Sequence, residues 1–402
     1  MSKKKKLIPK LRFPEFEKDG EWEVKVLSKI TDAIFDGTHQ TPKYTGDGIP
    51  FFSVENIVSR NKNKFISRED YQIATSKNKP EKGDVLITRI GKIGFSSVVN
   101  WDYEFSIYVT LACIKKSKYF NSYYLHSYFQ SNTYQYEILS KSLLNAVPCK
   151  INMNELRETR VLLPELGEQD KIASCLSFLD ETIAAHNQKL ELLKEHKKGL
   201  MQNIFPQEGR KGPKYRFPEF VKDGEWETRK LGDIAENLDS RRIPVTSTHR
   251  DKGDVPYYGA SGIIDYVKDY LFDETLLCIS EDGANLIDRN YPIAFNISGK
   301  TWVNNHSHVL KFNNIDTQLV VEAYINSINV EDFLTGMAQP KLNRAKLDII
   351  PIPLPKNAKE QQKIASCLSS LDKLITTQAQ KLEQLKLHKK GLMQGLFPKM
   401  ND

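Results

Sequence analysis

Three short motifs contain residues that could support catalysis or metal binding, but none has the spacing that such chemistry needs. Ala294-Phe-Asn-Ile-Ser-Gly-Lys-Thr301 ends like a phosphate-binding loop, yet alanine replaces its first glycine and a strand-like run follows where a helix should begin. His306-Ser-His308 has no third ligand at a metal-site spacing. Ser261 lacks the glycine two residues further on that a nucleophilic serine elbow needs. We therefore expect no catalytic residue and no metal site.

Sequence elements for methyl transfer and dinucleotide binding are also missing. The chain contains no Asn/Asp-Pro-Pro-Tyr/Phe element and no Gly-x-Gly-x-x-Gly fingerprint. Neighbouring carboxylates such as Glu281 and Asp282 do not by themselves indicate a nuclease or a glycosidase. The five cysteines form no Cys-x-x-Cys pair, and their odd number favours reduced thiols over a disulfide framework.

Length and composition indicate a folded protein of more than one domain. With 402 residues, 40% hydrophobic and 27% charged, the chain exceeds the usual size of a single core. Its apolar runs are too short to span a membrane and its basic start lacks a signal-peptide core, so we expect a cytoplasmic location. The net charge of +7 permits nucleic-acid binding. However, residues 31–167 carry 17 basic and 14 acidic side chains, whereas residues 235–359 carry 13 and 16.

The chain repeats itself. The segment from Pro9 to Ile30 returns as Pro213 to Ile234, and the segment from Glu168 to Pro206 returns 192 positions later with 27 of 39 residues identical. Between these copies lie two divergent segments, about residues 31–167 and 235–359. Such an arrangement suggests a fixed scaffold that carries two readers of different targets, because free drift after duplication would have eroded both parts alike.

The divergent segments and the repeated segments predict different structures. Short β-branched and aromatic runs broken by Gly, Asn, Asp and Pro indicate an α+β domain in each divergent segment. The repeated segments have apolar residues at alternating steps of four and three, which predicts a pair of long helices that begin near Pro164 and Pro355 and stop before Pro206 and Pro398. The expected seam comprises Ile172, Leu176, Leu179, Ile183 and His186 in the first helix and Ile364, Leu368, Leu371, Ile375 and Gln378 in the second.

The internal symmetry makes two further predictions about this helix pair. An antiparallel pair with an approximate two-fold axis should bring the central residues His186 and Gln378 together. The same axis should place the opening segment from Pro9 to Pro14 beside the end of the second helix near Pro398.

These repeats resemble the specificity subunits of type I restriction-modification systems. The resemblance rests on the two copies of Glu-Gln-x-Lys-Ile-Ala-x-x-Leu-x-x-Leu-Asp, which begin at Glu168 and Glu360, on the closing Lys-Lys-Gly-Leu-Met-Gln-x-x-Phe-Pro, and on Trp22 and Trp226 at the start of each unit. The Pro351-to-Pro355 run also fits, whereas the corresponding run from Val161 to Leu166 departs slightly. The match covers essentially the whole chain.

The resemblance implies a DNA-recognition subunit without catalysis of its own. Its target-recognition domains would be residues 1–167 and 207–359, and its spacer helices residues 168–206 and 360–402. Each domain would read one half of a bipartite site in double-stranded DNA. The helices would set the spacing and dock two modification subunits, which carry S-adenosylmethionine, and restriction subunits with motor and nuclease activity would then join.

Candidate DNA contacts are side chains suited to base edges or phosphates on loops of each domain. In the first domain they are Thr38, His39, Gln40, Lys43, Tyr44, Asn56, Arg60, Arg89 and Lys92. In the second they are Arg241, Arg242, His249, Arg250, Tyr258, Ser261, Asn285, Arg289, Asn304, Asn305 and His306.

Two alternatives remain open at this point. One is a self-contained restriction or modification enzyme with catalytic residues of an unfamiliar pattern. The other is a coiled-coil scaffold without a role on DNA, which the net-acidic second segment favours.

Overall fold

The computed structural model describes residues 6–59, 64–207, 209–336 and 339–400. The chain divides into two compact units, which we describe separately. Unit 1 comprises Met1–His186 with Lys381–Asp402, and unit 2 comprises Asn187–Gln380. Each unit therefore contains one divergent segment, the first half of one long helix and the second half of the other.

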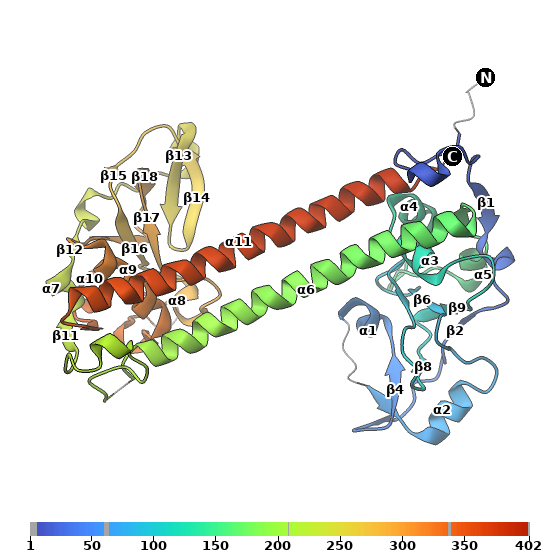
Figure 1. Cartoon of the computed structure of the whole chain (residues 1–402), viewed down its shortest axis with the longest axis horizontal. Helices are drawn as coiled ribbons and strands as arrows, with labels where there is room; N and C mark the ends of the chain where they lie inside the picture. Colours follow the sequence, from blue (N-terminus) through green and yellow to red (C-terminus); the bar gives the residue numbers. More distant parts are fainter. Residues whose placement is uncertain (1–5, 60–63, 208, 337–338, 401–402) are drawn as a thin grey trace. The chain divides into compact units, whose positions relative to one another are not determined.

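The long helices are α6 (Leu166–Ile204) and α11 (Ala358–Leu396), drawn in green and red in Figure 1. They begin just after Pro164 and Pro355 and end before Pro206 and Pro398, as predicted. Within each unit the two helices run antiparallel. Lys389 Nζ lies 2.5 Å from Asp180 Oδ1 in unit 1, and Lys197 Nζ lies 2.5 Å from Asp372 Oδ1 in unit 2. Within the described ranges, no helix is long and apolar enough to cross a membrane.

Unit 1 contains two four-stranded sheets and a two-stranded ribbon. The first sheet is antiparallel, in the order β2 (Ile34–Asp36), β9 (Leu111–Ile114), β6 (Val85–Thr88) and β7 (Ser96–Val98). The second has the order β3 (Tyr44–Thr45), β5 (Phe65–Ile66), β4 (Ile49–Phe52) and β8 (Ser106–Ile107), and its β4–β8 pair is parallel. The ribbon pairs β1 (Glu23–Val26) with β10 (Arg160–Leu163). Its short α-helices are α1 (Val54–Ser59), α2 (Arg68–Ala74), α3 (Ser122–Phe129), α4 (Asn132–Ser140) and α5 (Met153–Arg157).

Unit 2 has a related plan, in which the first sheet keeps the strand order of unit 1 and the second sheet does not. Its first sheet has the order β12 (Glu236–Asn237), β19 (Ser307–Lys311), β16 (Leu276–Ser280) and β17 (Ala294–Ile297). Its second has the order β14 (Gly262–Val267), β13 (Lys252–Gly259), β18 (Lys300–Val303) and β15 (Phe272–Asp273), and here too one pair, β13–β18, is parallel. The ribbon pairs β11 (Glu227–Lys230) with β20 (Pro351–Leu354). The short α-helices are α7 (Leu231–Ile234), α8 (Asn285–Asp288), α9 (Ile315–Ser327) and α10 (Arg344–Asp348).

Single 3₁₀ turns complete the described elements of both units. They are Pro14–Phe16, Leu27–Lys29, Pro218–Phe220, Asp239–Arg241, Ser247–His249 and Glu331–Phe333. Two of them, Pro14–Phe16 and Pro218–Phe220, stand at equivalent positions of the repeat. The α+β class and the internal repeat are confirmed, and the duplication extends into the segments whose sequences have diverged.

Each unit closes its core with the end of the other repeat's helix. In unit 1, Ile172 and Leu176 at the start of α6 pack in one cluster with Leu396 and Phe397 from the end of α11. The Phe397 ring meets Trp22 edge to face at 6.2 Å. In unit 2, Ile364 and Leu368 share a core with Ile204 and Phe205. The predicted seam residues are buried or half-buried, and the proximity of His186 to Gln378 stays a prediction.

A buried ion pair joins each repeated opening segment to the first turn of a long helix. Arg12 donates to both carboxylate oxygens of Glu168 at 2.9 and 2.7 Å, and Arg216 does the same to Glu360 at 2.8 and 2.8 Å. Both carboxylates have 1% of their side-chain surface exposed. We call these two pairs the Arg–Glu clamps. Hydrogen bonding to Glu168, and to Glu360 in the second copy, raises the pKa of each arginine, so both remain charged.

The opening segments also contact the helix ends as the symmetry predicted. Leu11 N donates to Gly395 O at 2.9 Å, and the equivalent Tyr215 N donates to Asn203 O at 2.9 Å. Thr133 Oγ1 adds a bond of 2.9 Å to Pro398 O. The predicted placement of the Pro9-to-Pro14 segment beside the end of α11 is therefore confirmed.

A half-buried carboxyl in unit 2 lies near the helix pair. Glu322 on α9 accepts a hydrogen bond from Asn296 and lies near the Lys197–Asp372 pair. Burial, with a smaller contribution from Asp372, raises the pKa of Glu322 to about 7. Because burial disfavours its charged form, the folded state binds a proton at this carboxyl more tightly than the unfolded chain does.

The first prediction concerns the clamp. Glu168→Gln should lower the free energy of unfolding by about 3 kcal/mol, because it leaves the buried Arg12 charge without a counter-charge. Urea unfolding measures this loss, and hydrogen exchange should assign it to unit 1. The control is Glu15→Gln, which breaks the exposed pair with Lys171 and should change stability far less. Equal effects of the two variants would contradict a stabilising clamp.

The second prediction concerns Glu322. Since its folded-state pKa lies above its unfolded value, its ionisation destabilises unit 2 above about pH 7, and this penalty disappears as the pH falls toward 5. Between pH 5 and pH 8, Glu322→Gln should therefore gain about 2 to 3 kcal/mol relative to the parent, measured by urea unfolding. The exposed Glu236→Gln should leave the pH profile unchanged. If the stability of Glu322→Gln and of the parent changed in parallel with pH, the pKa of Glu322 would not be raised in the folded protein.

Candidate nucleic-acid interface

In unit 1 the loops at one end of the first sheet converge on Asp36, the last residue of β2. Its carboxylate oxygen Oδ2 lies 3.0 Å from His39 Nε2 and 3.1 Å from Arg89 Nη1. Arg89 follows β6 and also donates to Val109 O at 2.9 Å and Ile151 O at 3.3 Å. Burial lowers the pKa of Arg89, and Asp36 partly offsets this effect. Arg89 thus ties four chain segments together at this edge.

The Thr38-to-Lys43 loop lies directly on the backbone of β8. A Cβ on Gly37 would stand 2.0 Å from Ile107 O, so only glycine permits this approach. Thr38 is fixed by bonds to Ile107 O and from Val109 N, each 3.0 Å long. His39, Gln40 and Lys43 are therefore presented to solvent by a loop whose base is rigid.

A hairpin from Leu143 to Lys150, which we call the 143–150 hairpin, borders this loop cluster. Leu143 N donates to Lys150 O at 2.7 Å, and Gly91 N donates to Cys149 O at 2.8 Å. The second bond joins the hairpin to the turn that carries Arg89 and the exposed Lys92.

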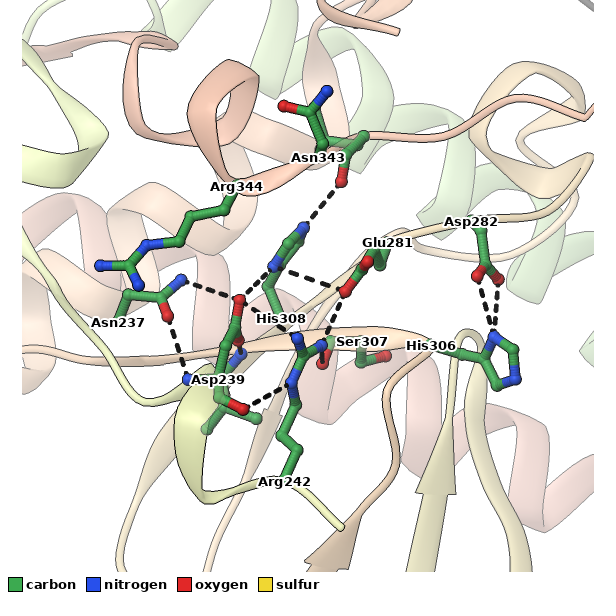
Figure 2. Close-up of polar contacts among 12 residues, drawn as sticks. Asn237, Asp239, Arg242, Glu281, Asp282, His306, Ser307, His308, Asn343 and Arg344 are labelled. Carbon is green, nitrogen blue, oxygen red and sulfur yellow. Dashed lines mark hydrogen bonds and ion pairs between the residues drawn. The ribbon is translucent and has the colours of Figure 1, made fainter. Parts of the chain in front are cut away.

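Unit 2 has a buried charge network at the corresponding edge (Figure 2). His308 Nδ1 lies 2.6 Å from Asp239 Oδ2, and His308 Nε2 lies 2.7 Å from Leu342 O. Arg242 Nη1 donates to Glu281 at 2.8 Å and to Ser307 O at 2.6 Å. This network links four segments of the chain, namely the residues after β12, the end of β16, the start of β19 and Leu342.

The acids of this network stay ionised despite their burial. Burial raises the pKa of Asp239, but hydrogen bonds from His308 and the Val309 amide outweigh it and bring the pKa below its usual value. Burial likewise opposes the charge of Glu281, whereas Arg242, His308 and Lys341 lower its pKa overall. Asp239, Glu281 and His308 are close enough to share a metal ion. However, Arg242 and Lys341, the latter 3.1 Å from Glu281, already balance the two carboxylates, so we interpret the cluster as structural.

Three neighbouring segments present polar groups beside this network. His306 Nδ1 lies 2.9 Å from both carboxylate oxygens of Asp282 and, as Figure 2 shows, points away from His308. Buried Asn304 holds the turn by accepting from His306 N at 2.8 Å, which leaves Asn305 exposed. Ser307 Oγ donates to Gly259 O at 2.8 Å, and this bond brings the turn with Tyr258 and Ser261 to the same place.

The structure does not bring all the predicted residues into these clusters. Asn56 is buried and accepts from Ser53 N, and Arg289 donates to the backbone of Leu286, Ile325 and Ile328. Asn285 bonds Tyr291 within its own turn. Three predicted residues are exposed and contact a nearby side chain. The Lys64 ammonium lies over the Tyr44 ring, Arg241 donates a hydrogen bond to Glu274, and His249 forms a hydrogen bond with Thr246. Arg250 is half-buried, pairs with Asp265 and covers the Tyr257 ring. Arg60 lies outside the described residues.

Sequence reasoning missed the partly buried acids that organise both edges. Asp36, Asp239 and Glu281 are not distinctive in type or spacing, and His308 was considered only as a partner of His306. A usable signal was the pair of echoes Ile151-Asn and Leu342-Asn, because Ile151 N donates to Arg89 O at 2.9 Å and Leu342 N to Glu281 O at 2.7 Å. Arg89 and Glu281 are thus equivalent positions of the two units.

Comparison with known proteins assigns the family. The family profile described as the type I restriction modification DNA specificity domain matches residues 20–195 and again residues 223–387. The chain belongs to this family. Its members are the non-catalytic specificity subunits of type I restriction-modification systems, which favours the adaptor over a self-contained enzyme.

Individual relatives agree. A type I restriction enzyme specificity subunit of Haemophilus influenzae is 35% identical over 155 residues, which cover 38% of this chain and 40% of that relative. The MjaX specificity subunit of Methanocaldococcus jannaschii is 26% identical over 409 residues, covering 94% of this chain and 93% of the relative.

Solved structures share the fold. The crystal structure of the S subunit of a type I system from M. genitalium superposes with a TM-score of 0.69 at 17% identity, covering 98% of this chain and all of that one. A chain solved in work on assembly of a type I system gives a TM-score of 0.52 at 14% identity, covering 94% and 97%.

The third prediction tests the unit 1 edge of this specificity subunit. Lys92→Ala should weaken binding of every DNA sequence about equally and reduce the slope of log affinity against log salt by about one, because one phosphate contact is lost. The control is Lys82→Ala, which removes a lysine from the opposite end of β6, where it pairs with Asp102. Fluorescence anisotropy at several salt concentrations measures both. An unchanged slope for Lys92→Ala would remove this turn from the interface.

Proposed function

We propose that this chain is the DNA-reading subunit of a type I restriction-modification complex, in which each unit reads one half of a bipartite site. The observation that carries the proposal is that two units with the same strand order in the first sheet and with equivalent clamps present different side chains at the same edge. Arg89 of unit 1 and Glu281 of unit 2 occupy equivalent positions, because the carbonyl of Arg89 accepts from Ile151 N and that of Glu281 accepts from Leu342 N. Their side chains nevertheless have opposite charge. A shared scaffold with different reading edges fits two different half-sites.

The proposed division of the chain follows the repeat. Residues 1–167 and 207–359 form the target-recognition domains, and residues 168–206 and 360–402 form the spacer. The spacer sets the distance between half-sites and docks two modification subunits, which bring S-adenosylmethionine, before restriction subunits join. Basic surfaces of the modification subunits would neutralise phosphates that the net-acidic second domain does not.

The predicted contact residues fall into two roles. Exposed side chains on fixed loops, namely His39, Gln40, Lys43, Lys92, Ser261, Asn305 and His306, are suited to contact bases or phosphates. Arg89, Arg242 and Asn304 position those loops, since their polar groups are engaged within the protein. Of the remaining predicted residues, Asn56 and Arg289 have polar groups engaged within the protein, and the others stay candidate contacts.

The fourth prediction tests the independence of the two readers. Replacing residues 31–167 with the equivalent segment of another specificity subunit should change one half of the methylated sequence and leave the other half and the gap unchanged. Mapping of methylated bases across a host genome, with and without the chain, gives both halves in one measurement.

The matching control replaces residues 235–359, which should change the opposite half. Independent reading would be wrong if either replacement altered both halves. No chain-dependent bipartite methylation with the parent protein would refute the function itself.

A further inference from the structure

The 143–150 hairpin holds an exposed apolar tip in one conformation. Backbone bonds in both directions join Leu143 and Lys150, and a further bond runs from Gly91 N to Cys149 O. On this frame Leu143 is 50%, Leu144 56% and Val147 100% exposed. Single apolar side chains often reach water, but three within eight residues on one hairpin make this tip a candidate contact surface.

Unit 2 has a corresponding hairpin from Thr335 to Lys341, which is one residue shorter than the 143–150 hairpin. Thr335 and Lys341 exchange backbone bonds of 2.8 Å, and Gly283 N donates to Pro340 O at 3.2 Å, as Gly91 N does to Cys149 O. By these bonds Thr335 and Gly336 occupy the positions of Leu143 and Leu144. The bonds at the base of the hairpin are thus kept, whereas the two exposed leucines of unit 1 are replaced at Thr335 and Gly336.

This difference identifies the kind of partner. A protein subunit that docks in two copies on the repeated scaffold would meet equivalent residues in both units. The two halves of a bipartite DNA site differ in sequence, so a surface that differs between the units fits DNA. The hairpin that carries the tip ends in Lys150 and is bonded to the turn that contains Lys92. Both lysines are suited to contact phosphates.

We propose that the Leu143, Leu144 and Val147 tip contacts the 5-methyl groups of thymines in the major groove of the half-site that unit 1 reads. The thymine methyl is the apolar group on the major-groove edge of unmodified base pairs, and apolar side chains recognise it by contact. This inference rests on the proposed function. It adds a thymine-specific reading element to unit 1, at positions where unit 2 has Thr335 and Gly336 in place of Leu143 and Leu144.

The test removes the methyl group from the DNA. The full chain, assembled with its modification subunits, is titrated with duplexes of the recognised site in which single thymines are replaced by deoxyuridine. In the half-site assigned to unit 1 by the domain exchange, at least one replacement should weaken binding about threefold to tenfold. A double variant, Leu144→Ser with Val147→Ser, should bind the thymine and deoxyuridine duplexes equally.

The matched control is Ile73→Ser on α2, an apolar side chain of unit 1 that is 64% exposed and distant in sequence from the hairpin. It should keep the parent's preference for thymine. The inference is overturned if no replacement in that half-site matters, if the half-site has no A·T pair, or if the preference survives in the double variant. It is also overturned if the double variant weakens assembly with the modification subunits in the absence of DNA. If the proposed function itself were wrong, the parent complex would select no bipartite site, which differs from selecting a site without dependence on the thymine methyl groups.

Discussion

The Arg–Glu clamps are the constraint on which the arrangement of each unit depends. Two side chains, brought from positions 156 residues apart in unit 1 and 144 apart in unit 2, form bidentate ion pairs that water hardly reaches. A buried charge without its partner is costly, so the opening segment, the ribbon beside it and the first turn of the helix must fold together. The adjoining bonds, from Leu11 to Gly395 and from Tyr215 to Asn203, then join the end of the other repeat's helix to the same structure. Each unit is therefore assembled from both copies of the duplicated sequence.

The duplicated frame leaves the reading edges free to differ. Both units keep the strand order of the first sheet, the clamp and the bonds at the base of the hairpin. However, unit 1 places Arg89 against Asp36, whereas unit 2 uses a denser network of Asp239, Arg242, Glu281 and His308. In both cases partly buried acids hold the basic side chains, so the exposed residues stand on loops that do not need to rearrange. Such pre-organisation lowers the entropy cost of binding and favours discrimination between sequences.

The sequence predicted the scaffold well because repetition and periodicity are properties of the chain itself. The helix bounds, the antiparallel pairing and the contact of the opening segment with the helix end all follow from two near-identical copies. The edges were predicted less completely. Whether Arg89 is exposed or buried depends on Asp36, which is 53 residues away and becomes its neighbour through the β2–β9–β6 order. Likewise, nothing local to Asn56 or Arg289 shows that their polar groups serve the backbone. The apolar tip was missed because apolar residues in a loop have no periodicity to mark them.

The central claim of the proposed function is that the two long helices set the separation of two independent readers. Its most direct test inserts four residues at equivalent points of α6 and α11, which lengthens each helix by about 6 Å. Since duplex DNA rises about 3.4 Å per base pair, the account predicts that both half-sites keep their sequences while the gap between them grows by one or two base pairs, as mapped by genome-wide methylation. An unchanged gap in a protein that still methylates both half-sites would contradict it.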